Sequence, residues 1–224
     1  MIEALIFDFD GVILETETPD FASWQEIFAE HGCALPRADW CAAIGLGATA
    51  MPFSPYDLLE TQVGRRVDRD AVRERRHRRY LELVAAENIM AGVETLIADA
   101  HRAGLKLGVA SSSDRAWVRG HLERLGLMDH FTTIKTADDV KRTKPHPDLY
   151  LAATEALGVR PDTALALEDS ANGVTAARRA GLYCVAIPNA MTRELALDHA
   201  DLRLISLTEM SLREILSVLE TQRR

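Results

Sequence analysis

Cysteine and lysine are scarce in this sequence. Its 224 residues include three cysteines, Cys33, Cys41 and Cys184, an odd number without the spacing of metal ligands or of a disulfide framework. Only four lysines stand against 22 arginines, and no lysine precedes Lys106. The cysteine usage argues against a secreted, disulfide-stapled domain, so we expect a reducing, cytoplasmic environment.

Other features are absent as well. No apolar run is long enough for a membrane span or a signal peptide, because the first apolar strand holds only about six residues. The net charge of −8 offers no general attraction to nucleic acid, and the seven histidines show no zinc-binding grouping. We therefore expect neither membrane nor nucleic-acid partners. A hydrophobic content of 47% suffices for a full α/β core.

Two aspartates follow the first apolar stretch. Residues 2–7 have the composition of a buried parallel strand, and Asp8 and Asp10 stand at its carboxyl end. Side chains at positions i and i+2 of a strand point to one face, and Gly11 lets the backbone turn closely beside a ligand. A metal can bind there, and one carboxylate oxygen can attack an electrophile. The pair indicates phosphoryl transfer, whereas a lone loop aspartate more often caps a helix or turn.

Polar residues follow two later apolar strands in the same manner. The stretch 105–110 runs into Ser111, and the stretch 163–167 runs into Glu168 and Asp169. Ligands of open α/β sheets bind outside the carboxyl ends of the strands, so we expect these side chains to meet. Structural alternatives remain, because Ser111 could cap the next helix and the two acids could favour the N-terminus of theirs.

Lys144 stands directly before Pro145, shortly before a helical pattern over 148–157. It could supply a cation to the site or be a solvated surface lysine. The chain then returns to ordinary alternation of strand and helix. We expect strands over 181–187 and 202–205 and a final helix over 211–220.

Taken in order, these residues resemble the four motifs of the haloacid dehalogenase superfamily of aspartate-nucleophile hydrolases. The matching segments are Asp8-Phe9-Asp10-Gly11-Val12, Ser111, Lys144-Pro145 and Glu168-Asp169-Ser170. The resemblance covers nearly the whole chain and is closest in layout to the β-phosphoglucomutase and phosphoglycolate phosphatase branch. It implies an α/β fold, with a doubly wound, Rossmann-like parallel sheet and an inserted, small all-α cap domain.

Phosphoryl transfer gives each of these residues a role. A phosphate ester repels an anionic nucleophile, so Mg²⁺ must bridge Asp8 and a phosphoryl oxygen before Asp8 can become an aspartyl-phosphate. Asp10 could protonate the leaving oxygen and then activate water. Ser111 and Lys144 would bind the oxygens of the transferring group.

The resemblance also implies the metal ligands. Besides Asp8, they are the backbone carbonyl of Asp10 and the carboxylate of Asp169. Glu168 is either a further ligand or a partner that holds coordinating waters.

The spacing of the motifs reveals an inserted region. About 100 residues separate the aspartate pair from Ser111, far more than one helix and its turns require. We therefore expect a core domain from residues 1–14 and 89–224 and a helical cap domain from residues 15–88. The expected helices run from Thr18, as N-cap before Pro19, to Gly32, from Pro36 to Ile44, from Ser54-Pro55 to before Gly64, and from Asp68 toward Glu87.

The insert resembles the small cap that would close over the aspartates, exclude water and select the substrate. Its loop from Gly45 to Ser54 could touch the leaving group or merely connect two helices. The stripe of Phe21, Trp24 and Phe28 predicts cap core. Eight arginines between positions 65 and 79 could bind an anion, but the acids among them favour a solvated helix face.

Differences between this sequence and other branches of the superfamily narrow the range of reactions that we expect. Dehalogenases of this superfamily lack the second aspartate, which is present here as Asp10, and phosphonatases use a cap lysine, which this chain lacks. In β-phosphoglucomutases a histidine corresponds to Asp20, and a basic cap loop holds a second phosphate, whereas the loop from Gly45 to Ala50 of this chain is neutral. We therefore predict a Mg²⁺-dependent, monomeric phosphatase acting on a small phosphorylated metabolite, first of all a sugar phosphate. The alternatives are a phosphosugar mutase and a non-catalytic binding or regulatory protein on the same fold.

Overall fold

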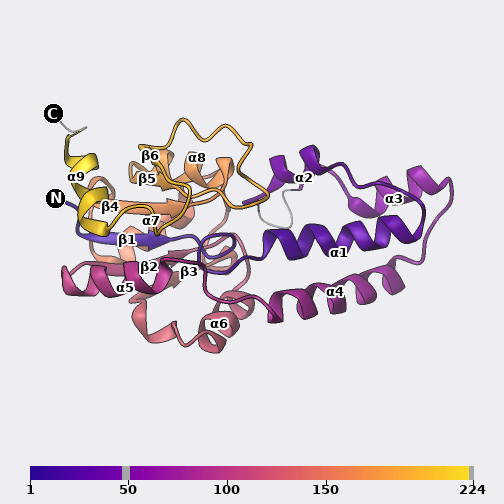
Figure 1. Cartoon of the computed structure of the whole chain (residues 1–224), viewed down its shortest axis with the longest axis horizontal. Coiled ribbons are helices and arrows are strands. Elements are labelled where there is room, and N and C mark those ends of the chain that lie inside the picture. Colours follow the sequence, from indigo (N-terminus) through magenta and orange to yellow (C-terminus); the bar gives the residue numbers. More distant parts are fainter. Residues whose placement is uncertain (47–50, 222–224) are drawn as a thin grey trace.

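The computed structural model describes residues 1–46 and 51–221. Within them, the core is a parallel sheet of six strands in the order β3-β2-β1-β4-β5-β6 (Figure 1). The strands are β1 Ala4–Phe7, β2 Lys106–Ala110, β3 Thr133–Lys135, β4 Ala164–Glu168, β5 Tyr183–Ala186 and β6 Leu202–Arg203. The strand order and direction confirm the expected doubly wound parallel sheet.

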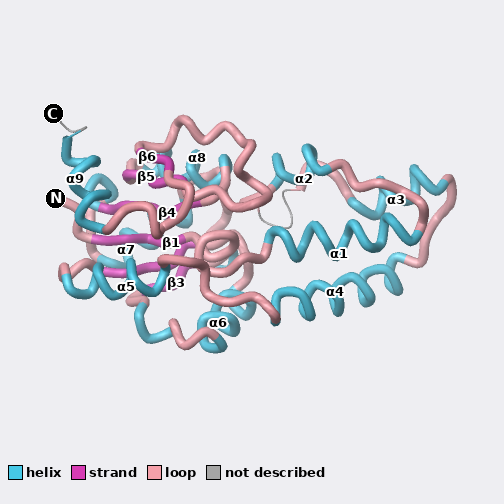
Figure 2. The backbone as a smooth tube through the Cα atoms, in the orientation of Figure 1, coloured by secondary structure: helices cyan, strands magenta, loops and turns pink. Residues whose placement is uncertain are grey.

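Alternate residues of β1 face two different hydrophobic layers. The core helices are α5 Val93–Arg102, α6 Arg115–Arg124, α7 Asp148–Leu157, α8 Ala171–Ala180 and α9 Leu212–Thr221. Leu5 and Phe7 pack in one cluster with side chains of α5, α6 and α9, whereas Ala4 and Ile6 pack in another with side chains of α7 and α8. Because side chains alternate across a strand, helices cover both faces of the sheet (Figure 2). The carboxyl ends of the strands stay free for a site.

The helices α1 Glu17–Glu30, α2 Arg37–Ala43, α3 Pro55–Val63 and α4 Arg69–Ala85 form a lobe beyond the carboxyl end of β1 (Figure 1). The aromatic stripe of α1 lies in the interior of this lobe, where Phe21, Trp24 and Phe28 pack with Leu59 and Val72, as expected.

Two segments join the lobe to the core, and they lie side by side. Leu14 and Ile89 form an antiparallel bridge, and the Met90 amide donates to the Ile13 carbonyl at 3.0 Å. The domain limits expected at residues 14/15 and 88/89 stay a prediction.

The first helix of the lobe begins earlier than expected. Thr16, not Thr18, is the N-cap residue of α1. Glu15 causes this early start, because its Oε1 accepts the amides of Glu17 and Thr18, both at 3.0 Å, which satisfies two free N–H groups of the first turn. Pro19 then falls within that turn, where its missing N–H costs nothing.

The starts of α3 and α4 agree with expectation. The Ser54 hydroxyl accepts the amide of Asp57 at 3.2 Å, and the Asp68 carboxylate accepts the amide of Ala71 at 3.1 Å. Gly64 ends α3 in the left-handed conformation. The helix α5 and the strand β3 had not been expected.

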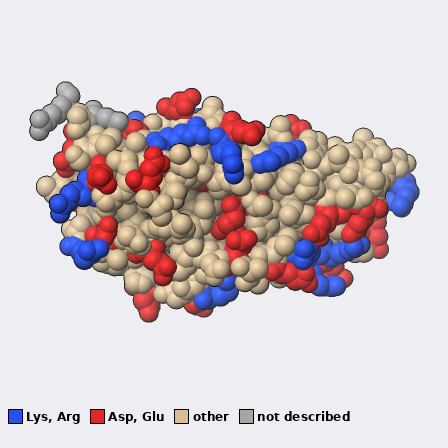
Figure 3. All heavy atoms as spheres, in the orientation of Figure 1, with Lys and Arg blue, Asp and Glu red and all other residues tan. Residues whose placement is uncertain are grey.

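The arginine-rich segment lies mostly on the surface of the lobe, where basic and acidic side chains alternate (Figure 3). Arg79 pairs with Glu26 of α1 at 2.9 Å, and Arg75 pairs with Glu30. These ion pairs support the interpretation that the arginines form a solvated helix face and not an anion-binding surface. None of the helices in the described ranges is long and apolar enough to cross a membrane.

We predict that Leu165→Ala lowers the free energy of unfolding by about 2–5 kcal/mol, because Leu165 is fully buried in the central strand β4 and its loss leaves a cavity. Leu151→Ala is the matched control, since the Leu151 side chain is 42% exposed on α7. Its effect should stay within about 0.5 kcal/mol. Urea denaturation of both variants measures the difference, and equal losses would contradict this account of the core.

Candidate active site

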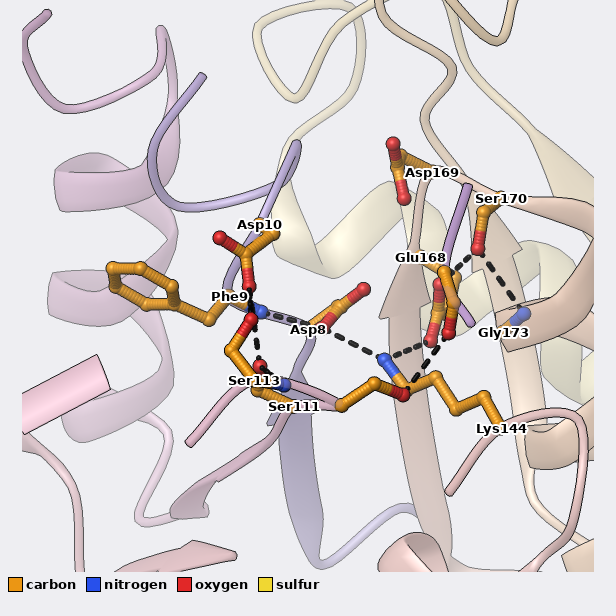
Figure 4. Close-up of polar contacts among 12 residues, drawn as sticks. Asp8, Phe9, Asp10, Ser111, Ser113, Lys144, Glu168, Asp169, Ser170 and Gly173 are labelled. Carbon is orange, nitrogen blue, oxygen red and sulfur yellow. Dashed lines mark hydrogen bonds and ion pairs between the residues drawn. The ribbon is translucent and has the colours of Figure 1, made fainter. Parts of the chain in front are cut away.

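The candidate site lies at the carboxyl ends of three adjacent strands. β1 ends before Asp8, β2 ends before Ser111, and β4 ends at Glu168. Residues of β1 pair in register with β2 and β4, and the Asp8 amide donates to the Leu167 carbonyl at 2.9 Å. Figure 4 shows these side chains turned toward one another. The expected convergence of the motif residues is therefore observed.

Lys144 lies between two carboxylates. Its Nζ is 2.7 Å from Asp8 Oδ1 and 2.7 Å from Glu168 Oε1, and its side chain is fully buried. Burial alone would lower the pKa of Lys144, but the two carboxylates outweigh it and hold the pKa above its usual value. Lys144 stays protonated, and the alternative of a solvated surface lysine is wrong.

Glu168 is held on several sides. Its Oε1 faces Lys144 and accepts a hydrogen bond from the Tyr150 hydroxyl, and its Oε2 accepts one from the Ser170 hydroxyl at 3.4 Å. Gly173 of α8 lies against this carboxylate, since a Cβ there would come 1.9 Å from Oε2. The site therefore depends on a glycine at this helix position.

Asp8, Glu168 and Asp169 form a buried acidic cluster. One carboxylate oxygen of each lies within 4.8 Å of the others. Asp169 Oδ2 accepts a hydrogen bond from Asn189 Nδ2 at 2.7 Å, while its buried Oδ1 has no partner among the described residues. A buried carboxylate oxygen without a partner is costly, and a cation would satisfy it.

The electrostatics of this cluster also favour a cation. Burial, followed by the charge of Glu168, raises the pKa of Asp8 well above its usual range despite Lys144. Burial and the charge of Glu17 raise the pKa of Asp169 in the same direction. Acidic oxygen ligands of this kind suit hard divalent ions such as Mg²⁺. The residues present therefore fit such an ion.

Asp10 is bound by four side-chain donors. Its Oδ1 accepts from Thr16 Oγ1 at 2.9 Å and from Trp117 Nε1 at 3.0 Å. Its Oδ2 accepts from Ser113 Oγ at 2.7 Å and from Ser111 Oγ at 3.2 Å. Ser111 thus contacts Asp10 and does not cap α6, whose N-cap is Asp114. These contacts fix the carboxylate two residues beyond Asp8.

A cavity of about 430 Å³ separates the site from the lobe. Asp8, Asp10 and Lys144 line its core end, and side chains from α1 and α4 line its other end. Of the loop expected to touch the leaving group, Gly45, Leu46 and Met51 line the cavity, whereas residues 47–50 lie outside the described residues.

The residues that follow α2 contact the core at the loop after β2 and at the first turn of α8. Ser112 Oγ donates to the Gly45 carbonyl at 3.0 Å, and Asn172 Nδ2 donates to the Ile44 carbonyl at 2.8 Å. A Cβ on Gly45 would lie 2.3 Å from Ser170 Oγ, so the chain approaches the acidic motif closely at this point.

Sequence reasoning missed several residues of the site. Trp117, Tyr150 and Asn189 contact the acids but follow no motif, and their positions within helix and loop patterns gave no signal. Thr16 was also missed, although it stands close to the aspartate pair in the sequence.

The arrangement of the site agrees with the known proteins to which the chain is similar. The family model described as haloacid dehalogenase-like hydrolase matches residues 5–187. The Bacillus subtilis (strain 168) protein named "Putative phosphatase YhcW" is 47% identical over 222 residues, covering 99% of this chain and 100% of that protein.

Two solved structures share the whole layout. A β-phosphoglucomutase from Clostridium difficile has a TM-score of 0.78 at 26% identity, with 100% of both chains covered. A CbbY variant from Rhodobacter sphaeroides in complex with xylulose-(1,5)bisphosphate has a TM-score of 0.72 at 30% identity, covering 95% of this chain and 98% of that one.

We predict that Gly173→Ala destabilises the protein by about 1–3 kcal/mol, because the added methyl group overlaps the Glu168 carboxylate and displaces it from Lys144. Gly120→Ala in α6 is the matched control, since a Cβ there meets no atom within 4 Å. The control should gain up to about 1 kcal/mol from helix propensity. Urea denaturation compares the two variants, and equal stability would refute the close approach.

Proposed function

We propose, from the premise that this chain belongs to the haloacid dehalogenase-like hydrolases, that it is a Mg²⁺-dependent phosphatase of a small phosphorylated metabolite. The geometry of Asp8 carries the proposal. Its Oδ1 is fixed by the Phe9 amide and by Lys144, both at 2.7 Å, while its Oδ2 receives no hydrogen bond from the described residues. Asp8 also lines the cavity, so a phosphate ester can reach it.

Asp8 acts as the nucleophile in this proposal. Its carboxylate attacks phosphorus and the ester oxygen departs, which leaves an aspartyl-phosphate on Asp8. Asp10 gives a proton to the departing oxygen and then takes one from the water that hydrolyses the aspartyl-phosphate. The hydrogen bonds from Thr16 and Trp117 keep the Asp10 carboxylate near this path.

The acidic cluster supplies the cation site. Asp8, Asp169 and the backbone carbonyl of Asp10 would hold the ion, which would neutralise the acids and the phosphoryl oxygens. Glu168 holds Lys144 in place, because its Oε1 is already occupied by Lys144 and Tyr150. Lys144 and Ser111 bind the oxygens of the transferring phosphoryl group.

A phosphosugar mutase is the second candidate, favoured by the full-length structural similarity to β-phosphoglucomutase. A mutase must hold a second phosphate at the far end of the cavity. The cation there, Arg76, is already paired with Asp20. We therefore prefer hydrolysis, and rapid interconversion of β-glucose 1-phosphate and glucose 6-phosphate without phosphate release would favour the mutase.

We expect the purified protein with Mg²⁺ to release phosphate from p-nitrophenyl phosphate, and Asp8→Asn to lower kcat by about 10³-fold or more, because the amide cannot attack phosphorus. Asp198→Asn, at an exposed carboxylate, is the control and should keep its activity. Equal rates for Asp8→Asn and the unaltered protein, or no release from a broad panel of phosphate esters, would support a non-catalytic binding or regulatory protein.

Metal binding should depend on pH. Without a cation, the pKa values of Asp8 and Asp169 are raised above 3.8, so at higher pH the folded state binds more protons than the unfolded state. The free energy of unfolding therefore falls as the pH rises from 3.8 through these raised pKa values. Mg²⁺ requires the deprotonated acids, so it should raise Tm more at pH 8 than at pH 5.5. Thermal unfolding with and without Mg²⁺ tests this.

In the same experiment Asp169→Asn should lose most of the Mg²⁺-dependent rise in Tm, whereas Asp198→Asn should keep it. A Tm rise of the same size at both pH values, or one retained in Asp169→Asn, would contradict the assignment of the cation site.

A further inference from the structure

Among the described residues, Arg76 is the cation that the lobe contributes to the cavity wall, and an acid already neutralises its charge. Arg76 of α4 forms an ion pair with Asp20 of α1, and its Nε donates to Ser23 Oγ at 3.1 Å. Its guanidinium lies 4.9 Å from the ring centroid of Tyr80 and 5.4 Å from that of Trp24. With only 18% of its side chain exposed, Arg76 is enclosed on all these sides and is not free to bind a second anion.

Glu17 is a carboxylate of the cavity wall without a partner. It lies one turn before Asp20 on α1, so both acids project from the same side of the helix. No described residue gives its side chain a hydrogen bond or an ion pair. Burial and the charge of Asp10 raise the pKa of Glu17, and the charge of Glu17 in turn raises the pKa of Asp169, so this carboxylate lies near the acids of the core.

Acids therefore outnumber cations among the described residues that line the cavity. Glu17 and Asp20 face the cavity against Arg76, while Lys144 is engaged by acids at the core end. The loop from Gly45 to Ser54 carries no ionisable side chain at any position of its sequence. The remaining wall includes the aromatic rings of Trp24, Trp40 and Tyr56.

We infer that Glu17 and Asp20 select the leaving group by charge, and that it bears hydroxyl or amino groups but no carboxylate and no second phosphate. This rests on the proposed phosphatase function. Hydroxyl or ammonium groups would donate to the unpartnered Glu17 carboxylate, and the aromatic rings would pack against the C–H faces of a sugar or polyol. An anionic leaving group would lose its hydration opposite the unpaired Glu17 carboxylate, and Arg76, already paired with Asp20, would offer it no free cation.

A matched series of hexose esters tests the inference. Glucosamine 6-phosphate, glucose 6-phosphate and 6-phosphogluconate have similar size, but their leaving groups are cationic, neutral and anionic. Fructose 1,6-bisphosphate adds a second phosphate, as in the ligand bound by CbbY. We expect kcat/KM for glucose 6-phosphate to be at least tenfold higher than kcat/KM for 6-phosphogluconate or for the bisphosphate. For glucosamine 6-phosphate, kcat/KM should equal or exceed the value for glucose 6-phosphate.

Glu17→Gln should lower the ratio of kcat/KM for glucose 6-phosphate to kcat/KM for 6-phosphogluconate at least threefold. Asp20→Asn should change this ratio in the same direction. Glu17→Gln is the decisive variant because it breaks no ion pair, whereas Asp20→Asn leaves Arg76 unpaired. Glu26→Gln on the same helix is the control, since Glu26 forms an exposed pair with Arg79 and should leave the ratio unchanged.

Equal kcat/KM for the neutral and anionic esters, or ratios unaltered in Glu17→Gln, would overturn the inference. So would activity on p-nitrophenyl phosphate together with no hydrolysis of any hexose ester. Failure to hydrolyse p-nitrophenyl phosphate with Mg²⁺ would instead refute the proposed function, so the two failures are distinguishable.

Discussion

The site depends on one buried ammonium group placed between two carboxylates. β1 and β4 are neighbours in the sheet, and each leads into an acid, so Asp8 and Glu168 would repel each other at the strand ends. Lys144 reaches between them from the loop before α7 and forms an ion pair with each. Removing one member of such a buried set leaves an uncompensated charge, which is far more costly than losing a surface ion pair. Tyr150 and Gly173 then fix Glu168, and through it the lysine.

Much of this arrangement could be predicted from the sequence, because each acid follows an apolar strand and parallel strands end at one edge. Asp8, Ser111, Glu168 and Asp169 meet where the pattern placed them, and the scarcity of lysine together with Pro145 drew attention to Lys144. The contacts of Trp117 could not be predicted in this way. Its position in α6 follows from helix periodicity, but the direction of its indole N–H toward Asp10 depends on packing between residues about 100 positions apart.

Other features were missed for local reasons. The strand β3 is only three residues long, and Thr133 and Lys135 give it no apolar run. The early start of α1 depends on the side chain of Glu15 accepting two backbone amides, which competes with the more usual signal of a threonine before proline. Asn189, which orients Asp169, lies in a loop without any periodic pattern.

The two ends of the cavity differ in their electrostatic character, and this difference is a property of the two lobes and not of one motif. The core end gathers acids around a lysine and suits a cation with a phosphoryl group. The wall built by α1 and α4 encloses Arg76 between aromatic rings, and no described residue forms an ion pair with its Glu17. In the proposed reaction, the core acids would act on the phosphoryl group while the wall from α1 and α4 would contact the rest of the ligand.

The bridge between Leu14 and Ile89 has a consequence for how this chain can vary. The backbone leaves the sheet and returns to it at one place, through two short segments hydrogen-bonded to each other. Other helices inserted there would lengthen neither connection and would leave the strands in place, although they would have to replace the contacts that Thr16 and Gly45 make with the core. Such an exchange would change the wall of the cavity while the acids at the strand ends stay in register.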